Sequence, residues 1–119
     1  MLAADEDNIV TGVEIKTSKT YNGKPVYKYM ASLTTASSAT GTFYSTSITN
    51  AENAHIVDGW IKGSDGYNHS LNSVWSTNSN LFTFTDVKDD AAYIYQTINQ
   101  SNLFSCRMFV IIEYTKTTD

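Results

Sequence analysis

Turn-forming residues recur about every ten residues along this chain, and most of the segments between them alternate apolar and polar side chains. A strand places successive side chains on opposite faces of a sheet, so alternation over about four to eight residues predicts a half-buried strand. Short strands at this spacing are typical of antiparallel sandwiches and barrels. The pattern therefore predicts an all-β domain: an antiparallel β-sandwich (jelly-roll-like or similar) of about eight short strands.

The expected strands occupy most of the chain. They cover residues 13–19, 26–33, 42–48, 55–62, 67–75, 81–87, 92–98 and 106–115. Segment 108–112 is apolar on both faces, which predicts a central and fully covered strand. Segment 89–100 leaves a helix open as an alternative, because Ala92, Tyr95 and Ile98 would form a narrow apolar stripe. Its Tyr, Ile and Thr residues favour the strand.

Three turn signals define hairpins between these strands. Asn-Gly at 22–23 is the strongest, because both residue types accept a positive φ angle. Residues 63–66 (GSDG) and the Asp-Asp pair at 89–90 mark two further turns. The first hairpin is expected to set the strand register so that Tyr27 and Tyr29 reach one face of the sheet.

Length and composition agree with a single β domain. The chain has 119 residues, of which 41% are hydrophobic and 17% charged, and much of the remainder is Ser, Thr and Asn. This composition suits pleated, half-buried surfaces. We expect residues 1–11 to be a flexible acidic leader or linker from an upstream segment, and residues 12–119 to be one sandwich domain. The leader carries acids where a secretory signal would carry bases, so it does not resemble an export signal.

Charge and residue types argue against several classes of function. A net charge of −4 disfavours binding to nucleic acid, which depends on Lys and Arg at the phosphates. The longest apolar run, 108–112, is far shorter than the roughly 20 residues of a membrane span. Cys106 is the single cysteine, which excludes an internal disulfide and predicts a small buried residue. With two histidines, we expect neither a metal site nor a cofactor.

The sequence contains no recognisable catalytic pattern, and we expect no enzyme activity. Its carboxylates lie mainly in or beside turns, where solvated acids are usual. Aromatic residues lie next to polar loops between residues 58 and 80, and such rings stack on sugars or fill protein interfaces. The candidate receptor-binding residues are Trp60, Asp65, Tyr67, Asn68, His69 and Trp75. For each of the two tryptophans, the favoured interpretation is the plainer one, that it fills the core.

The two ends of the chain carry a family resemblance. They read NGKPVYK at 22–28 and VIIEYTKTTD at 110–119, with ITN at 48–50 and IVDG at 56–59 between them. These elements resemble a C-terminal β domain that recurs in tail-fibre and minor structural proteins of bacteriophages and prophages. The resemblance covers most of residues 12–119, and its specific motifs are the two terminal ones.

The resemblance implies a domain on the virion surface, at the distal end of a tail fibre, spike or head fibre, made in the cytoplasm of the bacterial host. It further implies binding to a host-surface glycan or protein without catalysis. A homotrimer is expected, since 15 aromatic residues exceed the needs of one small core. Tyr27, Tyr29 or strand 108–114 would form its contact. The alternatives are a purely structural trimerisation or attachment cap, and a carbohydrate-binding module of a bacterial surface protein.

Overall fold

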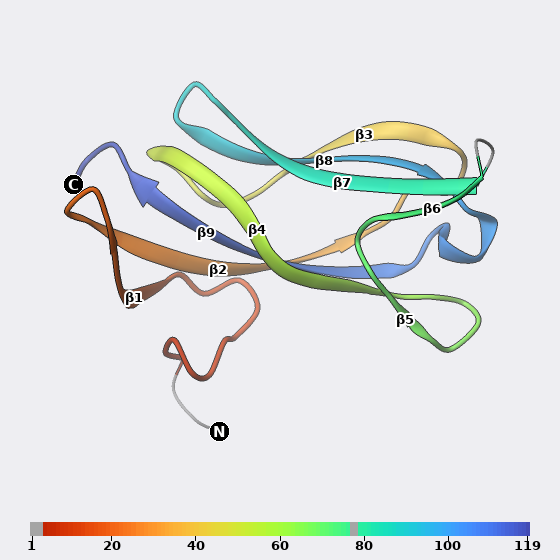
Figure 1. Ribbon diagram of the computed structural model, residues 1–119, viewed down its shortest axis with the longest axis horizontal. Coiled ribbons are helices and arrows are strands. Elements are labelled where there is room, and N and C mark those ends of the chain that lie inside the picture. Colours follow the sequence, from red (N-terminus) through yellow and green to blue (C-terminus); the bar gives the residue numbers. More distant parts are fainter. Residues whose placement is uncertain (1–3, 77–78) are drawn as a thin grey trace.

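The computed structural model describes residues 4–76 and 79–119, apart from the side chain of Trp75. Within these residues, nine strands form two antiparallel sheets that pack face to face, as the sequence predicted (Figure 1). A short 3₁₀ turn, η1 (Ser101–Leu103), is the single helical element of the described chain. No helix in this part is long and apolar enough to cross a membrane.

Each sheet draws its strands from distant parts of the chain. The five-stranded sheet has the order β1 (Ile15–Tyr21), β2 (Lys24–Thr34), β9 (Arg107–Lys116), β4 (Ala51–Lys62) and β5 (Asn68–His69). The four-stranded sheet has the order β3 (Thr40–Ser45), β8 (Ala91–Asn99), β7 (Ser79–Lys88) and β6 (Ser73–Ser76). The chain passes from one sheet to the other between β2 and β3, β3 and β4, β5 and β6, and β8 and β9.

Strand β9 occupies the middle of the five-stranded sheet, between β2 and β4, which confirms its predicted central position. Its inward residues alternate along the strand and belong to the core between the sheets: Met108, Val110, Ile112 and Tyr114. The opposing sheet contributes Leu81, Ile94 and Ile98 to the same core. Tyr27 and Tyr29 pair with β9 and pack against this core from one face, also as expected.

The predicted turns close the hairpins. Asn22 and Gly23 have φ angles of 52° and 79°, and Asp89 and Asp90 have φ angles of 53° and 62°. Two consecutive residues with positive φ match the right-handed twist of the flanking strands. Residues 91–99 form strand β8 with strictly alternating burial, so the helical alternative for 89–100 is wrong. The Asp-Asp turn places this segment beside β7, where its branched and aromatic residues pair across the sheet.

One expected strand, 67–75, is divided between the two sheets. Asn68 and His69 pair with β4, whereas Ser73 and Val74 pair with β7 in the opposite sheet. Leu71 lies between these pieces and is buried in the core. A single straight strand cannot pair with β4 in one sheet and with β7 in the other. The chain therefore crosses from one sheet to the other at Leu71.

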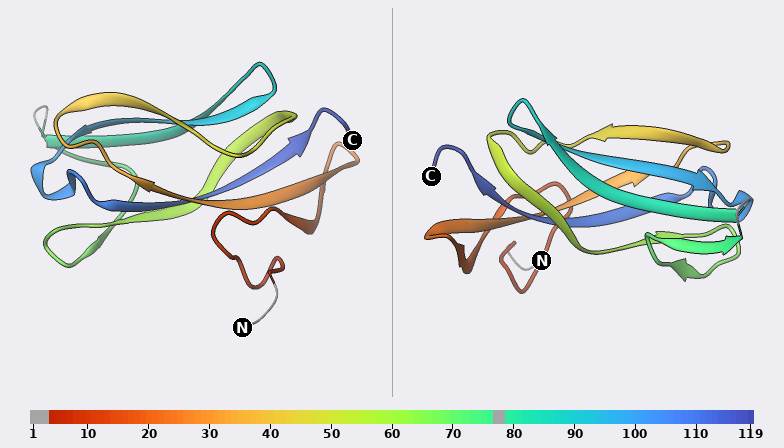
Figure 2. Two further views of the ribbon diagram at one scale, coloured as in Figure 1. Left: turned by 180° about the vertical axis from the view of Figure 1, so that it is seen from behind. Right: turned by 45° about the horizontal axis from the view of Figure 1, so that its top comes forward.

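The N-terminal segment lies on the side of the five-stranded sheet that faces away from the four-stranded sheet (Figures 1 and 2). The backbone N–H of Gly12 donates to the carbonyl of Met30 on β2, at 2.9 Å. The Glu6 carboxylate accepts the backbone N–H of Ser18 on β1, at 3.0 Å. Glu6, within the expected leader, and Gly12, just after it, therefore contact the first hairpin.

Cys106 is buried in the core cluster, as the sequence predicted. Its backbone N–H donates to the hydroxyl of Thr35 at 2.8 Å, and the same hydroxyl donates to the carbonyl of Leu103 at 2.6 Å. These bonds tie the loop after β2 to the segment that leads into β9.

Candidate functional site

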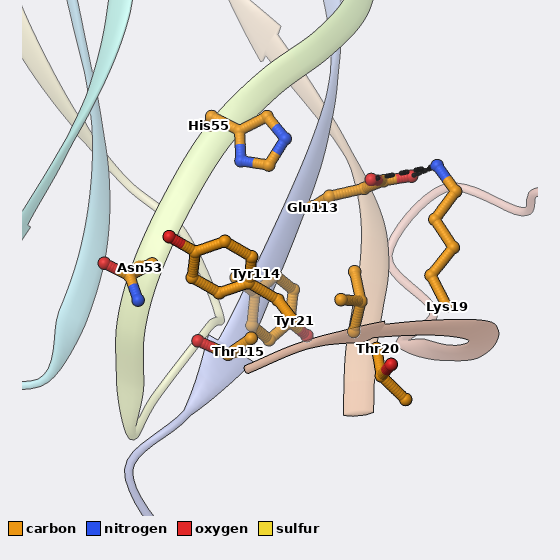
Figure 3. Close-up of a pocket in the computed structure, with 9 residues that line it drawn as sticks. Lys19, Thr20, Tyr21, Asn53, His55, Glu113, Tyr114 and Thr115 are labelled. Carbon is orange, nitrogen blue, oxygen red and sulfur yellow. Dashed lines mark hydrogen bonds and ion pairs between the residues drawn. The ribbon is translucent and has the colours of Figure 1, made fainter. Parts of the chain in front are cut away.

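A cavity of about 280 Å³ lies on the outward face of the five-stranded sheet (Figure 3). Strands β2, β9 and β4 supply its floor, with the outward residues Val26, Glu113, Thr115, Asn53 and His55, and the core residue Tyr114 also lines the cavity. The end of β1 passes across this face and adds Lys19, Thr20 and Tyr21. The pairing of β1 with β2 shifts register between Lys16 and Thr20, and such an irregularity bends an edge strand.

The Tyr21 ring gives the cavity an exposed aromatic surface. Tyr21 is 56% exposed, and its side chain reaches from β1 over β9 (Figure 3). Asn53 and His55 approach from β4, and both are exposed. His55 is the cross-strand neighbour of Glu113, so an imidazole and a carboxylate lie on the same face of adjacent strands. The cavity thus combines one ring face with several hydrogen-bonding groups.

Glu113 is the buried charge of this site. Its side chain is 6% exposed, and one carboxylate oxygen lies 3.1 Å from Lys19 Nζ and 3.4 Å from Lys28 Nζ. Burial raises the pKa of Glu113, but the hydrogen bonds and charges of the two lysines outweigh this effect, so its pKa is lower than usual. Glu113 is therefore ionised at neutral pH and accepts hydrogen bonds at the cavity floor.

We expect Glu113→Gln to lower the free energy of unfolding by about 2 kcal/mol at neutral pH, because both lysines lose a charged acceptor. Since the pKa of Glu113 is lower in the folded chain, its ionised form stabilises the fold above the unfolded value of about 4.3. That contribution is lost as pH falls through the folded pKa. Urea unfolding at several pH values should show the difference between wild type and Glu113→Gln shrinking towards acid.

Glu52→Gln is a matched control for this prediction. Glu52 lies 2.7 Å from Lys24, but the two side chains are 41% and 30% exposed. Solvent screens such a pair, so its loss should cost less than about 1 kcal/mol. Equal effects of the two substitutions, or a Glu113 difference that grows in acid, would contradict the role assigned to Glu113.

The structure brings four of the sequence-predicted site residues together in the hairpin between β4 and β5. Asp65 is their centre: its carboxylate accepts the Tyr67 backbone N–H at 3.0 Å and lies 2.9 Å from His69 Nε2. Asn102 donates to the same carboxylate at 3.2 Å. The Tyr67 N–H, ahead of His69 and Asn102, holds the pKa of Asp65 below its usual value. Asp65 and His69 therefore hold the turn together, while Tyr67 and Asn68 are exposed.

Of the two predicted tryptophans, the structure describes the side chain of Trp60. Trp60 lies on β4, where it is half-buried and stacks on Phe109 with the ring centroids 5.1 Å apart. It is not part of the core between the sheets, so the expectation that Trp60 fills the core is wrong. The side chain of Trp75 lies outside the part of the chain that the structure describes.

The cavity residues Tyr21, Asn53, His55 and Glu113 were not predicted as a site. The nearest sequence signal is Glu113, a single acid that follows the apolar run 108–112. Its partners come from β1 and β4, which are distant in sequence and become neighbours through the pairing of β9 with β4 and the bend of β1.

The other sheet carries an aromatic face on its outward side. Phe43, Tyr95 and Phe84 form one row across β3, β8 and β7. The Tyr95 ring lies 4.5 Å from that of Phe43 and 5.1 Å from that of Phe84, measured between centroids. We call the outward residues of β3, β8 and β7 the aromatic face.

Comparison with known proteins adds no assignment, since neither a family model nor a curated protein nor a solved structure matches this chain. In the described residues, no group of three or more His, Cys, Asp and Glu side chains is arranged to hold a metal ion.

Proposed function

We propose that this chain is a non-catalytic virion surface domain, at the distal end of a phage tail fibre, spike or head fibre, and that it binds a host-surface glycan. The observation that carries the proposal is the cavity beneath β1, which combines the exposed Tyr21 ring with Asn53, His55 and Glu113. The phage setting comes from the resemblance of the two terminal motifs.

The cavity chemistry suits a single sugar ring. A sugar presents an apolar C–H face, which packs on an aromatic ring, and hydroxyl groups, which need donors and acceptors. Tyr21 supplies the ring, the Glu113 carboxylate supplies an ionised acceptor, and Asn53 offers both donor and acceptor groups. A volume of about 280 Å³ is at the small end of ligand pockets, which favours one terminal residue of a glycan.

Binding without hydrolysis is the chemistry that this site supports. Glycosidases commonly use two carboxyl groups on either side of the scissile bond. Among the described residues that line the cavity, Glu113 is the one carboxylate, and two lysines hold its charge. We propose that Glu113 positions a hydroxyl group and transfers no proton.

A glycan array followed by titration of the strongest hit tests this proposal. Tyr21→Ala should weaken binding at least about tenfold, as expected for removal of an aromatic anchor. The melting temperature should change little, because Tyr21 is 56% exposed. Glu113→Gln serves as a second variant, and its binding loss is measured below its melting transition.

Tyr67→Ala is the matched control, since Tyr67 is 72% exposed in the hairpin that the sequence predicted as the site. Its binding should equal that of wild type. Loss of binding in Tyr67→Ala and not in Tyr21→Ala would move the site to the 65–69 hairpin. If wild type binds no glycan on the array, the proposed function is wrong.

A further inference from the structure

The aromatic face exposes more apolar surface than a solvated sheet normally does. Phe43, Phe84 and Phe82 are 64%, 46% and 44% exposed. Phe43 of β3 and Phe84 of β7 lie on either side of Tyr95 of β8, and the three rings form the row. Phe82 lies beside the row, two residues before Phe84 on β7. Contiguous exposed apolar surface of this kind marks an interaction site.

The same face is hollowed next to the aromatic row. A cavity of about 510 Å³ is lined by Phe43, Tyr93, Asp86, Val87 and Lys88. The face therefore carries both projecting rings and a recess beside them. A surface with both features can accept a copy of itself, because the projecting rings of each copy can enter the recess of the other.

The charges on the aromatic face are also self-complementary. Asp86 and Lys88 are the charged residues among its described members, one of each sign, and both line the recess. The chain as a whole has a net charge of −4, so two copies repel each other over most of their surfaces. The strands of this face carry one charge of each sign, so each Asp86 can pair with the Lys88 of the other copy, although the Asp89-Asp90 turn at the edge of the face is acidic.

The area of the face is more than half of what a standard interface requires. Its three strands, spaced about 4.8 Å apart and the longest of ten residues, cover on the order of 500 Å². A standard interface buries about 800 Å² on each partner, and flanking turns add to the area of the sheet itself. Burial of the phenylalanine rings would supply the apolar centre of such an interface.

We infer that the aromatic face packs against the same face of a second copy of this chain. The sequence placed the contact of a homotrimer at Tyr27, Tyr29 or strand 108–114. Tyr27 and Tyr29 are half-buried and pack against the chain's own core, whereas the aromatic face is the more exposed surface. A face that packs against itself makes a two-fold dimer, so this contact differs from the expected trimer in both place and symmetry. The glycan site lies on the opposite sheet, so self-association and glycan binding are independent of each other.

Light scattering over a range of protein concentrations tests the inference. Wild type should approach twice the 13.2 kDa chain mass as its concentration rises, and a mass of three chains would contradict the two-fold contact. Phe84→Lys should raise the dissociation constant for self-association at least about tenfold. Phe43→Lys should do the same, and circular dichroism should show the β-sheet retained in both variants. Tyr67→Lys, on the other sheet, should associate as wild type does.

The charge pair gives a second, sharper test. Asp86→Lys and Lys88→Asp should each weaken self-association, because each places like charges at the facing recess. A mixture of the two variants should associate again, since one copy then carries two positive groups and its partner two negative groups. A wild type that remains at 13.2 kDa, an unchanged mass for Phe84→Lys, or a mixture that stays dissociated would overturn the inference.

Discussion

Ile112→Ala should lower the free energy of unfolding by about 3–4 kcal/mol, among the largest effects of any single substitution in this chain. Ile112 is fully buried on β9, the central strand of its sheet, and pairs with Tyr29 on one side and Ile56 on the other. Its truncation leaves a cavity in the core that neighbouring strands cannot easily close. Thermal melting should shift down by roughly 10–15 °C.

Val57→Ala is the control for this prediction. Val57 is 42% exposed and lies at the register shift of β4, between Ile56 and Asp58. Removing exposed methyl groups forms no internal cavity, so its cost should stay below about 1 kcal/mol. If Ile112→Ala costs no more than Val57→Ala, the core does not lie between the two sheets as described.

Gly59→Ala is expected to destabilise the fold by about 2–3 kcal/mol, although it adds only one methyl group. A Cβ atom at Gly59 would lie 2.4 Å from Leu71 Cδ1 and 2.6 Å from the backbone oxygen of Phe109. The second contact cannot be relieved by a side-chain rotation, because Phe109 belongs to the paired strand β9. Urea unfolding of the purified variant measures the loss.

Gly41→Ala separates steric conflict with the backbone from conflict with a side chain. A Cβ atom there would lie 2.3 Å from the hydroxyl oxygen of Tyr95 and meets no backbone atom among its nearest neighbours. The Tyr95 ring is half-buried on the aromatic face and can swing outwards. We therefore expect a smaller cost than for Gly59→Ala, and the reverse order would refute the proposed cause.

The crossing at Leu71 shows why Gly59 matters to the fold. Leu71 is buried where the chain crosses from one sheet to the other. Gly59 has no side chain, and the Leu71 side chain occupies the space that a Cβ atom at Gly59 would need. The sequence predicted one strand over 67–75, because alternation continues through the crossing. Alternation reports which side chains are buried, but not which sheet buries them.

The candidate site was harder to predict than the fold. The residues predicted from the sequence lie close together along the chain, in the 65–69 hairpin and at the two tryptophans on either side of it, Trp60 and Trp75. In the structure, the Asp65 carboxylate and His69 Nε2 form a hydrogen bond within the turn. Tyr21, His55 and Glu113 gather only because β9 pairs with β4 and β1 bends over both, and no spacing in the sequence encodes that meeting.

The sequence by itself determined the all-β class, the Asn-Gly and Asp-Asp hairpins and the central place of 108–112. Each depends on local preferences: the backbone angles of adjacent residues, or side chains that alternate along one strand. Tertiary structure alone decided the division of strands between two sheets, the outward position of Trp60, and the cavity around Glu113. These depend on which distant strands pair, and pairing is settled by burial of a core to which strands far apart in the sequence contribute.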